Sequence, residues 1–578
     1  MQTRRRRWPV DRVDLLVSAV YGLAALWVTS RLWDGPGNLR TAAVPDDENV
    51  FEWFLAHGAR WVTHGGNPLF SSQVLRPEGA NMMVNTSILG LSVPLAPVTL
   101  WLGPHAAFVI AVTLCLWGTA WGWFLVVRRL VSSRLAAFLG AALCGFGPGM
   151  IAHAAGQLDL AAEFLVPFLV LLTVRLAAPG RWWARALLLG VLAAYQIMIA
   201  EEPLFVTGVT VAVFLGLYAA QRPAEVRPLV GRFLGGLGLA GAVALLLVGY
   251  PLWFQFSGPR HATGVMAGAA NWITPVDWYV SIPPSSIGGN PTAANTVTSY
   301  SEYNEFFGWS LVLVVVLIVA WRWRDPVVRA LAGAGLVAGL ISLGKTIRYG
   351  SYVLGPGPFA GLAHLPLFDK LTPSRFGLAV MVVFGVLIAL GLDHWTGLRI
   401  QPAAVRRVGA AAVAVALLPL VPTPLMTVEV SPVPAFVTSG AWKAYVGPGQ
   451  SVVGVPVPMF GHAQAMRWST ATGLDLPLAS GYMLGPVGAD GSQVDFNPPV
   501  RTLAGLLNDA ADHGKVPAPL TDEQRQAVLA DLRYWRAAIV VARVNDPNAG
   551  QIRSLCDALF GPGVQTGGAW VWDVRPLS

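Results

Sequence analysis

Residues 42–61 read AAVPDDENVFEWFLAHGARW and place Asp46, Asp47, Glu48 and Glu52 within seven positions. The rest of the chain is poor in charge, because 12% of its 578 residues are Asp, Glu, Lys or Arg, against about a quarter in a typical soluble domain. The acidic stretch follows the first long apolar run of the sequence. Its position relative to a membrane therefore decides how the chain folds and which chemistry it can support.

Long apolar runs recur along the chain, of which 54% is hydrophobic. Each has about 17 to 25 residues, the length that an α-helix needs to cross a hydrocarbon core of about 30 Å. The sequence therefore predicts an all-α polytopic membrane protein with about 11 to 13 transmembrane helices. The expected spans are residues 12–32, 104–127, 135–152, 160–177, 185–200, 203–220, 231–255, 307–321, 328–344, 374–392 and 408–425.

A further apolar segment, residues 87–103, is short and contains Pro94 and Pro97. If it crosses, the later arginine-rich loops lie outside; if it is re-entrant or interfacial, they all lie inside. Arginine in short loops marks the cytoplasmic side, so we expect 11 spans and a cytoplasmic N-terminus in the plasma membrane, with 12 or more spans as the alternative. The arginines concerned are Arg4 to Arg7, Arg128, Arg129, Arg134, Arg181, Arg185, Arg322, Arg324, Arg406 and Arg407.

This topology predicts a transmembrane domain over residues 1–425 and places most polar sequence on the outer face. The expected outer loops are residues 33–86, which carry the acidic stretch, and residues 256–306 and 345–373. A small extracytoplasmic α/β domain is expected over residues 426–578. Its patterns are the strands SVVGVPVPMF (451–460), AAIVVARVND (537–546) and GAWVWDVRP (568–576) and the amphipathic helix TDEQRQAVLADLRYWRA (521–537).

The acidic stretch opens a segment with apolar residues near helical spacing, which predicts an amphipathic helix on the membrane surface with Asp46 or Asp47 as its N-cap. A carboxylate at the interface can also take a proton from a hydroxyl that attacks a lipid-linked donor. A second carboxylate can hold a divalent cation, and arginine suits a leaving phosphate. The stretch therefore fits either a helix start or a catalytic site.

The Asp-Asp pair in the first outer loop resembles the modified DxD motif of GT-C glycosyltransferases, which are integral-membrane enzymes that use polyprenyl-phosphate sugars. The resemblance is to bacterial members of actinobacterial type and covers residues 10 to 400. Gln157 stands where many members have His. The motifs that carry it are GGNPLFSSQVLRPEGANMMVNTSILGLSVPLAPV (65–98), HAAGQLDL (153–160), SEYNEFFGWSLV (301–312), SLGKTI (342–347) and LTPSRFGLAVMVV (371–383).

The resemblance implies a GT-C fold and inverting transfer of a hexose or pentose from a polyprenyl-phosphate donor to a glycan, lipid or protein of the cell envelope. Asp46 or Asp47 would be the general base, and the same pair could hold Mg²⁺ or Mn²⁺. Other polar residues predicted on the outer face are candidates for binding substrate. They are Glu48, His153, Asp159, Glu201, Glu202, Glu302, Lys345 and Arg375.

Two other classes of function remain open. A transporter or lipid flippase would use the same carboxylates to couple cations or protons, and a non-catalytic scaffold of envelope assembly would need no cavity beside them. One observation separates these alternatives, namely whether one of Asp46 and Asp47 lines the same cavity as Glu201 and Arg375. A nucleic-acid partner is not indicated, because the net charge of +8 resides in inter-helix loops. The sequence contains no P-loop, HExxH or CxxC motif.

Overall fold

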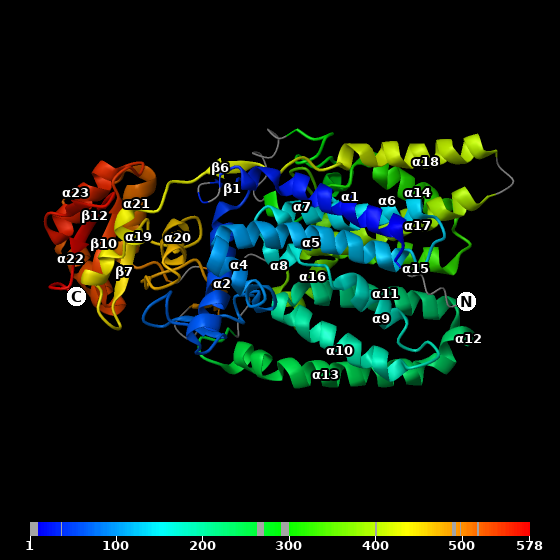
Figure 1. Ribbon diagram of the computed structural model, residues 1–578, viewed down its shortest axis with the longest axis horizontal. Helices are drawn as coiled ribbons and strands as arrows, with labels where there is room; N and C mark the ends of the chain where they lie inside the picture. Colours follow the sequence, from blue (N-terminus) through cyan, green and yellow to red (C-terminus); the bar gives the residue numbers. More distant parts are fainter. Residues whose placement is uncertain are drawn as a thin grey trace.

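The computed structural model describes residues 10–35, 37, 39–262, 271–290, 300–398, 402–487, 493–496, 499–516 and 519–578. The arginine run at Arg4 to Arg7 and parts of the expected loop 256–306 lie outside these described residues. A bundle of long helices occupies most of the molecule, and the C-terminal domain is attached at one end of the bundle (Figure 1).

Seven helical segments of the described residues are long and apolar enough to cross a membrane. Two shorter apolar helices, α14 (Trp309–Trp321) and α15 (Pro326–Ser342), accompany them. This confirms the predicted polytopic helical fold class. The seven segments contain α1 (Arg12–Thr29), α5 (Pro104–Val127), α6 (Arg134–Phe146) with α7 (Pro148–Ala154), α10 (Trp182–Ile199), α11 (Glu202–Gln221), α12 (Pro223–Val226) with α13 (Val230–Ser257), and α17 (Phe376–Gly397).

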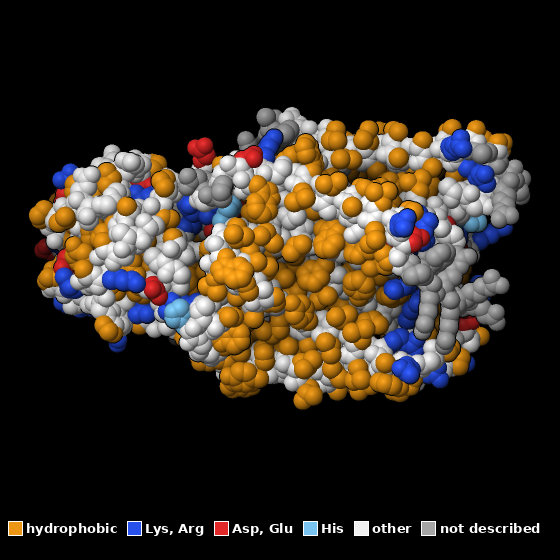
Figure 2. Space-filling model, in the orientation of Figure 1, with side chains coloured by type: hydrophobic (Ala, Val, Ile, Leu, Met, Phe, Trp, Pro, Cys, Tyr) orange, Lys and Arg blue, Asp and Glu red, His pale blue; other side chains and the backbone are white. Residues whose placement is uncertain are grey.

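The centre of the bundle is formed by α5, α6 and α17, which bury most of their residues, whereas α11 and α13 expose apolar side chains. Figure 2 shows the resulting apolar surface over the bundle. Small residues allow the central helices to approach closely. At Gly140 of α6, an added Cβ would lie 2.4 Å from the carbonyl oxygen of Gly385 in α17. A side chain at either glycine would therefore push these two helices apart.

Several shorter helices accompany the long ones. The ambiguous segment 87–103 forms α3 (Leu89–Ser92) and α4 (Ala96–Leu102), neither of which is long enough to cross a membrane. The expected span 160–177 overlaps α8 (Leu158–Ala161) and the nine-residue α9 (Val166–Val174). The remaining helices outside the C-terminal domain are α16 (Phe359–Leu362) and α18 (Ala403–Leu417).

The helix that carries the acidic stretch, α2 (Pro45–His64), is buried over most of its length and does not expose one polar face as an amphipathic surface helix would. Its residues from Glu48 to Ala59 are all buried, because α2 packs between α4 and α5 of the bundle and α20 (Gln464–Ala471) of the C-terminal domain. The N-cap prediction is also wrong. The helix begins at Pro45, a residue favoured at the first helical position, and Val44 makes no capping bond.

The C-terminal domain is an α/β domain, as predicted. Its sheet has the strand order β11-β12-β10-β7, in which β7 is parallel to β10 and the other pairs are antiparallel. The apolar run of β10 suits a central strand that is buried on both faces. The strands are β7 (Ser451–Val455), β10 (Ala537–Arg543), β11 (Val564–Thr566) and β12 (Ala569–Asp573), and the helices are α19 (Ala435–Thr438), α20, α21 (Thr502–His513), α22 (Asp522–Trp535) and α23 (Ala549–Phe560).

Hydrogen bonds attach the C-terminal domain to the segment between α1 and α5. Strand β1 (Leu39–Thr41) pairs with β6 (Thr427–Glu429), and the side chain of Asn85 bonds to both the amide and the carbonyl of Leu484. The other two-stranded pairs are β2 (Phe70–Ser71) with β3 (Ala80–Asn81), β4 (Thr346–Tyr349) with β5 (Tyr352–Pro356), and β8 (Gly485–Val487) with β9 (Gln493–Asp495).

Lys and Arg side chains gather at the end of the bundle away from the C-terminal domain (Figure 2). From the positive-inside rule we expect that end to face the cytoplasm. We expect a cysteine in place of the exposed Glu523 of α22 to react with a membrane-impermeant maleimide in intact spheroplasts. A cysteine in place of the exposed Arg324, between α14 and α15, should react only after permeabilisation. The native cysteines, Cys115, Cys144 and Cys556, are buried, so background labelling should be low. The reverse labelling pattern would contradict the topology.

Candidate functional site

A cavity of about 1290 Å³ lies between the helix bundle and the C-terminal domain. The bundle contributes side chains from α2, α8, the α10–α11 junction and the start of α17. The C-terminal domain contributes Phe460, Tyr482, Leu484, Val494, Asp495 and Phe496. Apolar and aromatic side chains cover much of its wall, as in most small-molecule sites. The polar side chains that line it include Asp47, Asn85, Gln157, Asp159, Glu201, Gln255, Glu202, Glu302, Lys370, Thr372, Arg375, Tyr482 and Asp495.

Asp47 lines this cavity and accepts hydrogen bonds on both carboxylate oxygens. The Tyr482 hydroxyl donates to Oδ1 over 2.8 Å, and the Gln157 side-chain amide donates to Oδ2 over 3.2 Å. Burial raises the pKa of Asp47 above its ordinary value, although both hydrogen bonds act in the opposite direction. A carboxylate that is held in place and has a raised pKa is suited to accept a proton.

The neighbouring Asp46 has a different role in the structure. Its Oδ1 accepts a hydrogen bond of 3.1 Å from the backbone amide of Ala463, just before α20. Asp46 is not among the described residues that line the cavity. Burial also raises the pKa of Asp46, but its carboxylate joins α2 to the C-terminal domain. The two adjacent aspartates therefore differ in what they contact.

Gln157 connects Asp47 to the predicted site residue His153. The Gln157 Oε1 atom lies 2.7 Å from Nδ1 of His153, which must carry the proton because an amide oxygen only accepts. His153 is buried and is not among the described residues that line the cavity. The amide of Gln157 is thereby oriented so that its nitrogen points to Asp47. The residue that departs from the expected histidine thus makes a direct contact with the candidate base.

Arg375 meets Glu202 and Glu302, two of the predicted site residues, at the cavity wall. Its Nη2 lies 3.2 Å from Glu302 Oε1, and its Nη1 pairs with Glu202 Oε2. Glu302 also accepts a hydrogen bond of 2.6 Å from the Ser374 hydroxyl. With two carboxylates on one guanidinium, this cluster carries a net negative charge when all three groups are ionised.

Glu201 and Asp159 complete the set of predicted acidic residues in the cavity. Glu201 Oε2 accepts a hydrogen bond of 3.1 Å from Gln255, whereas its buried Oε1 has no partner. Burial raises the pKa of Glu201, and burial raises the pKa of Asp159 to about 7 despite the opposing charge of Arg375. Asp159 therefore titrates close to neutral pH.

The charged residues of the described cavity wall are mostly acidic. Six carboxylates and two cationic side chains line it, which attracts cations. The donor set is all oxygen, which suits Mg²⁺ or Mn²⁺, and Glu202 Oε1 is buried without a partner. The oxygen atoms of this wall are of the kind that a divalent cation prefers, but Asp47, Asp159 and Glu202 do not have metal-ligand spacing to one another in the described structure.

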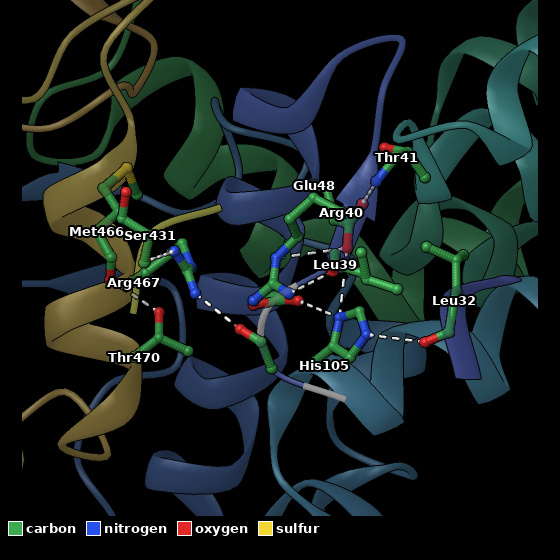
Figure 3. Close-up of polar contacts among 12 residues, drawn as sticks. Leu32, Leu39, Arg40, Thr41, Glu48, His105, Ser431, Met466, Arg467 and Thr470 are labelled. Atoms are coloured by element: carbon green, nitrogen blue, oxygen red, sulfur yellow. Dashed lines mark hydrogen bonds and ion pairs between the residues drawn. The ribbon is translucent and has the colours of Figure 1, made fainter. Parts of the chain in front are cut away.

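Two predicted site residues, Lys345 and Glu48, are not among the described residues that line the cavity. The ammonium group of Lys345 donates a hydrogen bond of 2.9 Å to Asn271 Oδ1. Glu48 points into a buried ionic cluster on the other side of α2, where its Oε2 accepts a hydrogen bond of 2.7 Å from the Thr41 amide. Figure 3 shows this cluster, in which Arg40 and His105 converge on Glu48.

The ionic cluster is formed by Arg40, Glu48, Glu52 and His105. Arg40 Nη2 lies 2.9 Å from Glu52 Oε2, and His105 Nδ1 lies 2.8 Å from Glu52 Oε1 and 3.3 Å from Glu48 Oε1. Burial raises the pKa of Glu52, but Arg40 and His105 outweigh it and hold that pKa below its ordinary value. Among the described residues, only Glu48, Glu52 and His105 form a three-membered group with metal-ligand spacing. Arg40 already supplies a positive charge there.

Arg467 extends this polar region into the C-terminal domain (Figure 3). From α20 it donates hydrogen bonds of 2.9 Å to the carbonyl of Ser431 and 2.8 Å to the carbonyl of Gly37. Burial lowers the pKa of Arg467 to about 10, which leaves it charged at neutral pH. The cluster and Arg467 together hold α2 against both domains.

The contributions of Tyr482, Gln157 and Arg40 to this region were not predicted from the sequence. Tyr482 lies more than 400 positions from Asp47, in a stretch without a recognisable motif. Gln157 was noticed only as a departure from the expected histidine. Arg40 was the residue that could have indicated the ionic cluster. It lies six positions before Asp46, and a charged residue so close to a buried acidic helix needs a partner of opposite charge.

The fold was compared with known structures. An Archaeoglobus fulgidus oligosaccharyltransferase, AglB in complex with an inhibitory peptide and a dolichol-phosphate, matches 92% of this chain and 69% of its own at 10% identity and a TM-score of 0.50. The apo form of the oligosaccharyltransferase of that organism matches 99% and 72% at 12% identity and a TM-score of 0.50. ArnT from Cupriavidus metallidurans in the apo state matches 98% of each chain at 11% identity and a TM-score of 0.43.

No protein-family model matches the sequence, and no curated protein matches it. At the identities above, the structural likeness shows the fold alone. The molecule is a polytopic membrane protein with a strand-containing domain near its C-terminus. It has the GT-C fold of integral-membrane glycosyltransferases, which confirms the fold that the sequence motifs predicted.

The buried cluster provides a stability test. We expect Glu52→Gln to lower the free energy of unfolding by about 3 kcal/mol, because breaking a buried ion pair leaves the charge of Arg40 undercompensated. Asp475→Asn is the matched control, since Asp475 pairs with Arg60 and Lys443 at the surface. It should cost about 1 kcal/mol or less. Thermal unfolding of both variants in detergent measures the difference, and equal losses would contradict this role of the cluster.

Proposed function

We propose that this chain is a membrane glycosyltransferase that moves a sugar from a polyprenyl-phosphate donor to an acceptor hydroxyl of the cell envelope. The observation that carries the proposal is that Asp47, Glu201 and Arg375 line one cavity, at the end of the bundle that bears the C-terminal domain. A scaffold would need no such cavity. The GT-C fold supports the same class of activity.

Asp47 is the general base in this mechanism, and Asp46 is not. Asp47 faces the cavity, whereas the Asp46 carboxylate is bonded to the backbone of the C-terminal domain. The acceptor hydroxyl gives its proton to the Asp47 carboxylate as its oxygen forms a bond to the anomeric carbon of the donor. The bond from that carbon to the phosphate oxygen breaks, and the lipid phosphate leaves with the electron pair. A single displacement of this kind inverts the anomeric centre.

The phosphate binds on the side of the cavity that carries Lys370 and Arg375, which are its cationic lining residues in the described chain. Because Arg375 is already paired with Glu202 and Glu302, its charge alone does not balance a phosphate. A divalent cation that binds together with the donor phosphate at the acidic wall of the cavity would supply the missing positive charge at the leaving group. The acceptor reaches Asp47 beneath the C-terminal domain.

The choice between the two aspartates is tested by Asp47→Asn and Asp46→Asn in proteoliposomes. The probes are radiolabelled polyprenyl-phosphate hexoses and pentoses, with an envelope extract as acceptor. We expect Asp47→Asn to lower kcat by about 100-fold or more, because general-base catalysis contributes about that much. Asp46→Asn should retain most of the activity of the wild-type chain. Full activity of Asp47→Asn, or equal loss in both variants, would contradict the assignment.

Cation dependence is tested by chelation. We expect EDTA to abolish sugar transfer in proteoliposomes and Mg²⁺ or Mn²⁺ to restore it, since the carboxylate-rich cavity leaves the donor phosphate without sufficient compensation. Thermal unfolding measured in parallel controls for damage to the fold. Unchanged transfer after exhaustive chelation would show that Lys370 and Arg375 suffice.

A further inference from the structure

The C-terminal domain contributes directly to the environment of the candidate base. Tyr482 belongs to that domain, lines the cavity and donates a hydrogen bond of 2.8 Å to Asp47 Oδ1. Its ring packs against Phe460 and Phe496, with ring centroids 5.5 Å and 5.2 Å away. Tyr482 is 6% exposed. These ring contacts and the low exposure restrict the direction in which its hydroxyl points.

We propose that Tyr482 is a positioning residue for sugar transfer, so that the catalytic centre is complete only when the C-terminal domain is docked on the bundle. This inference rests on the proposed function, in which Asp47 is the base. The transmembrane domain supplies Asp47 and Gln157, and the C-terminal domain supplies the third member of the group.

The geometry explains how two donors prepare Asp47. A carboxylate has about four lone-pair positions on its two oxygens. Tyr482 takes one on Oδ1 and Gln157 takes one on Oδ2, which fixes the plane of the group and leaves the other positions for the acceptor hydroxyl. Burial raises the pKa of Tyr482 far above its ordinary value, and the Asp47 charge raises it further, so the phenol stays protonated and continues to donate.

Tyr482 also affects how readily Asp47 accepts a proton. The other ionisable groups that influence Asp47 are Asp46 on the same helix, Asp159 on α8 and Arg375 at the start of α17. Tyr482 is the residue of the C-terminal domain that bonds directly to the Asp47 carboxylate, so through this bond the proton affinity of Asp47 depends on that domain. Removing its hydroxyl withdraws a bond that favours the charged carboxylate. The protonated form of Asp47 should then persist to higher pH.

Several other contacts also dock the C-terminal domain on the bundle. The Asp46 carboxylate accepts the bond from the Ala463 amide, Asn85 bonds to the backbone of Leu484, and the Tyr534 hydroxyl donates to the carboxylate of Glu78. Tyr534 thus makes the same kind of bond between the same two parts of the chain as Tyr482, but it is not among the described cavity-lining residues. It provides a matched control.

The test compares Tyr482→Phe with Tyr534→Phe in the full chain. Carbodiimide-driven amine labelling of Asp47 is followed by mass spectrometry across pH, because the protonated carboxyl reacts. We expect the labelling midpoint to move to higher pH in Tyr482→Phe and to stay in place in Tyr534→Phe. In transfer assays with polyprenyl-phosphate hexoses and pentoses, the acid limb of kcat/KM should move in the same direction. The loss at neutral pH should be about tenfold or more.

A second variant has a side chain of similar size and is expected to move the labelling midpoint in the opposite direction. Incorporating 3,5-difluorotyrosine at position 482 makes the hydroxyl a stronger donor, so the labelling midpoint should move to lower pH. If both changes leave the midpoint where it is in the wild-type chain, the inference is overturned. If the midpoint moves as expected but Asp47→Asn retains sugar transfer, the contact stands and the proposed function fails. If Asp47→Asn is inactive and Tyr482→Phe behaves like Tyr534→Phe, the proposed function stands and the inference fails.

Discussion

The pairing of Glu48 and Glu52 with Arg40 and His105 is the interaction on which the candidate site depends. Burying two carboxylates is costly unless charges of opposite sign accompany them. This cluster therefore determines the position of α2 between the bundle and the C-terminal domain. In that position, the first turn of α2 places Asp47 at the cavity. The four carboxylates of the acidic stretch therefore divide into two that hold the helix, one that ties the domains together and one that faces the cavity.

The acidic character of the cavity defines the chemistry that the site supports. Burial raises the pKa of Asp159 to about 7, despite the opposing charge of Arg375. Such a wall disfavours a bare anion and favours cations or neutral hydroxyl groups. A phosphate donor is therefore expected to bring or require a compensating cation, and a hydroxyl acceptor is compatible with the wall as it stands.

Much of the fold could be predicted from sequence because hydropathy and strand patterns are local. The apolar runs predicted the long helices, and the run from Ala537 to Arg543 is the central strand of the C-terminal sheet. The prediction of an exposed polar face on Pro45–His64 was wrong because burial on that side comes from α20, hundreds of residues away. The polar residues of that helix were predicted to form a solvated face, whereas their hydrogen-bond and ion-pair partners are buried within the protein.

The candidate site was predicted in part for the same reason. The order of the motifs and their shared membrane face predicted that Asp47, Glu202 and Arg375 belong to one site. In the structure these three residues line one cavity. The choice between Asp46 and Asp47 could not be made from sequence, because adjacent helical residues point in different directions and only the position of the C-terminal domain shows which one faces the cavity. The contact of Tyr482 with Asp47 could not be predicted either, because it also depends on the position of the C-terminal domain.

The account is tested most directly by a cryo-electron microscopy structure of the full chain in nanodiscs with a non-cleavable polyprenyl-phosphonate sugar. The account predicts the sugar in the cavity, with its anomeric carbon facing the Asp47 carboxylate and its phosphonate on the side of Lys370 and Arg375. A ligand bound at the opposite end of the bundle, or a cavity that stays closed to it while it binds elsewhere, would contradict the account.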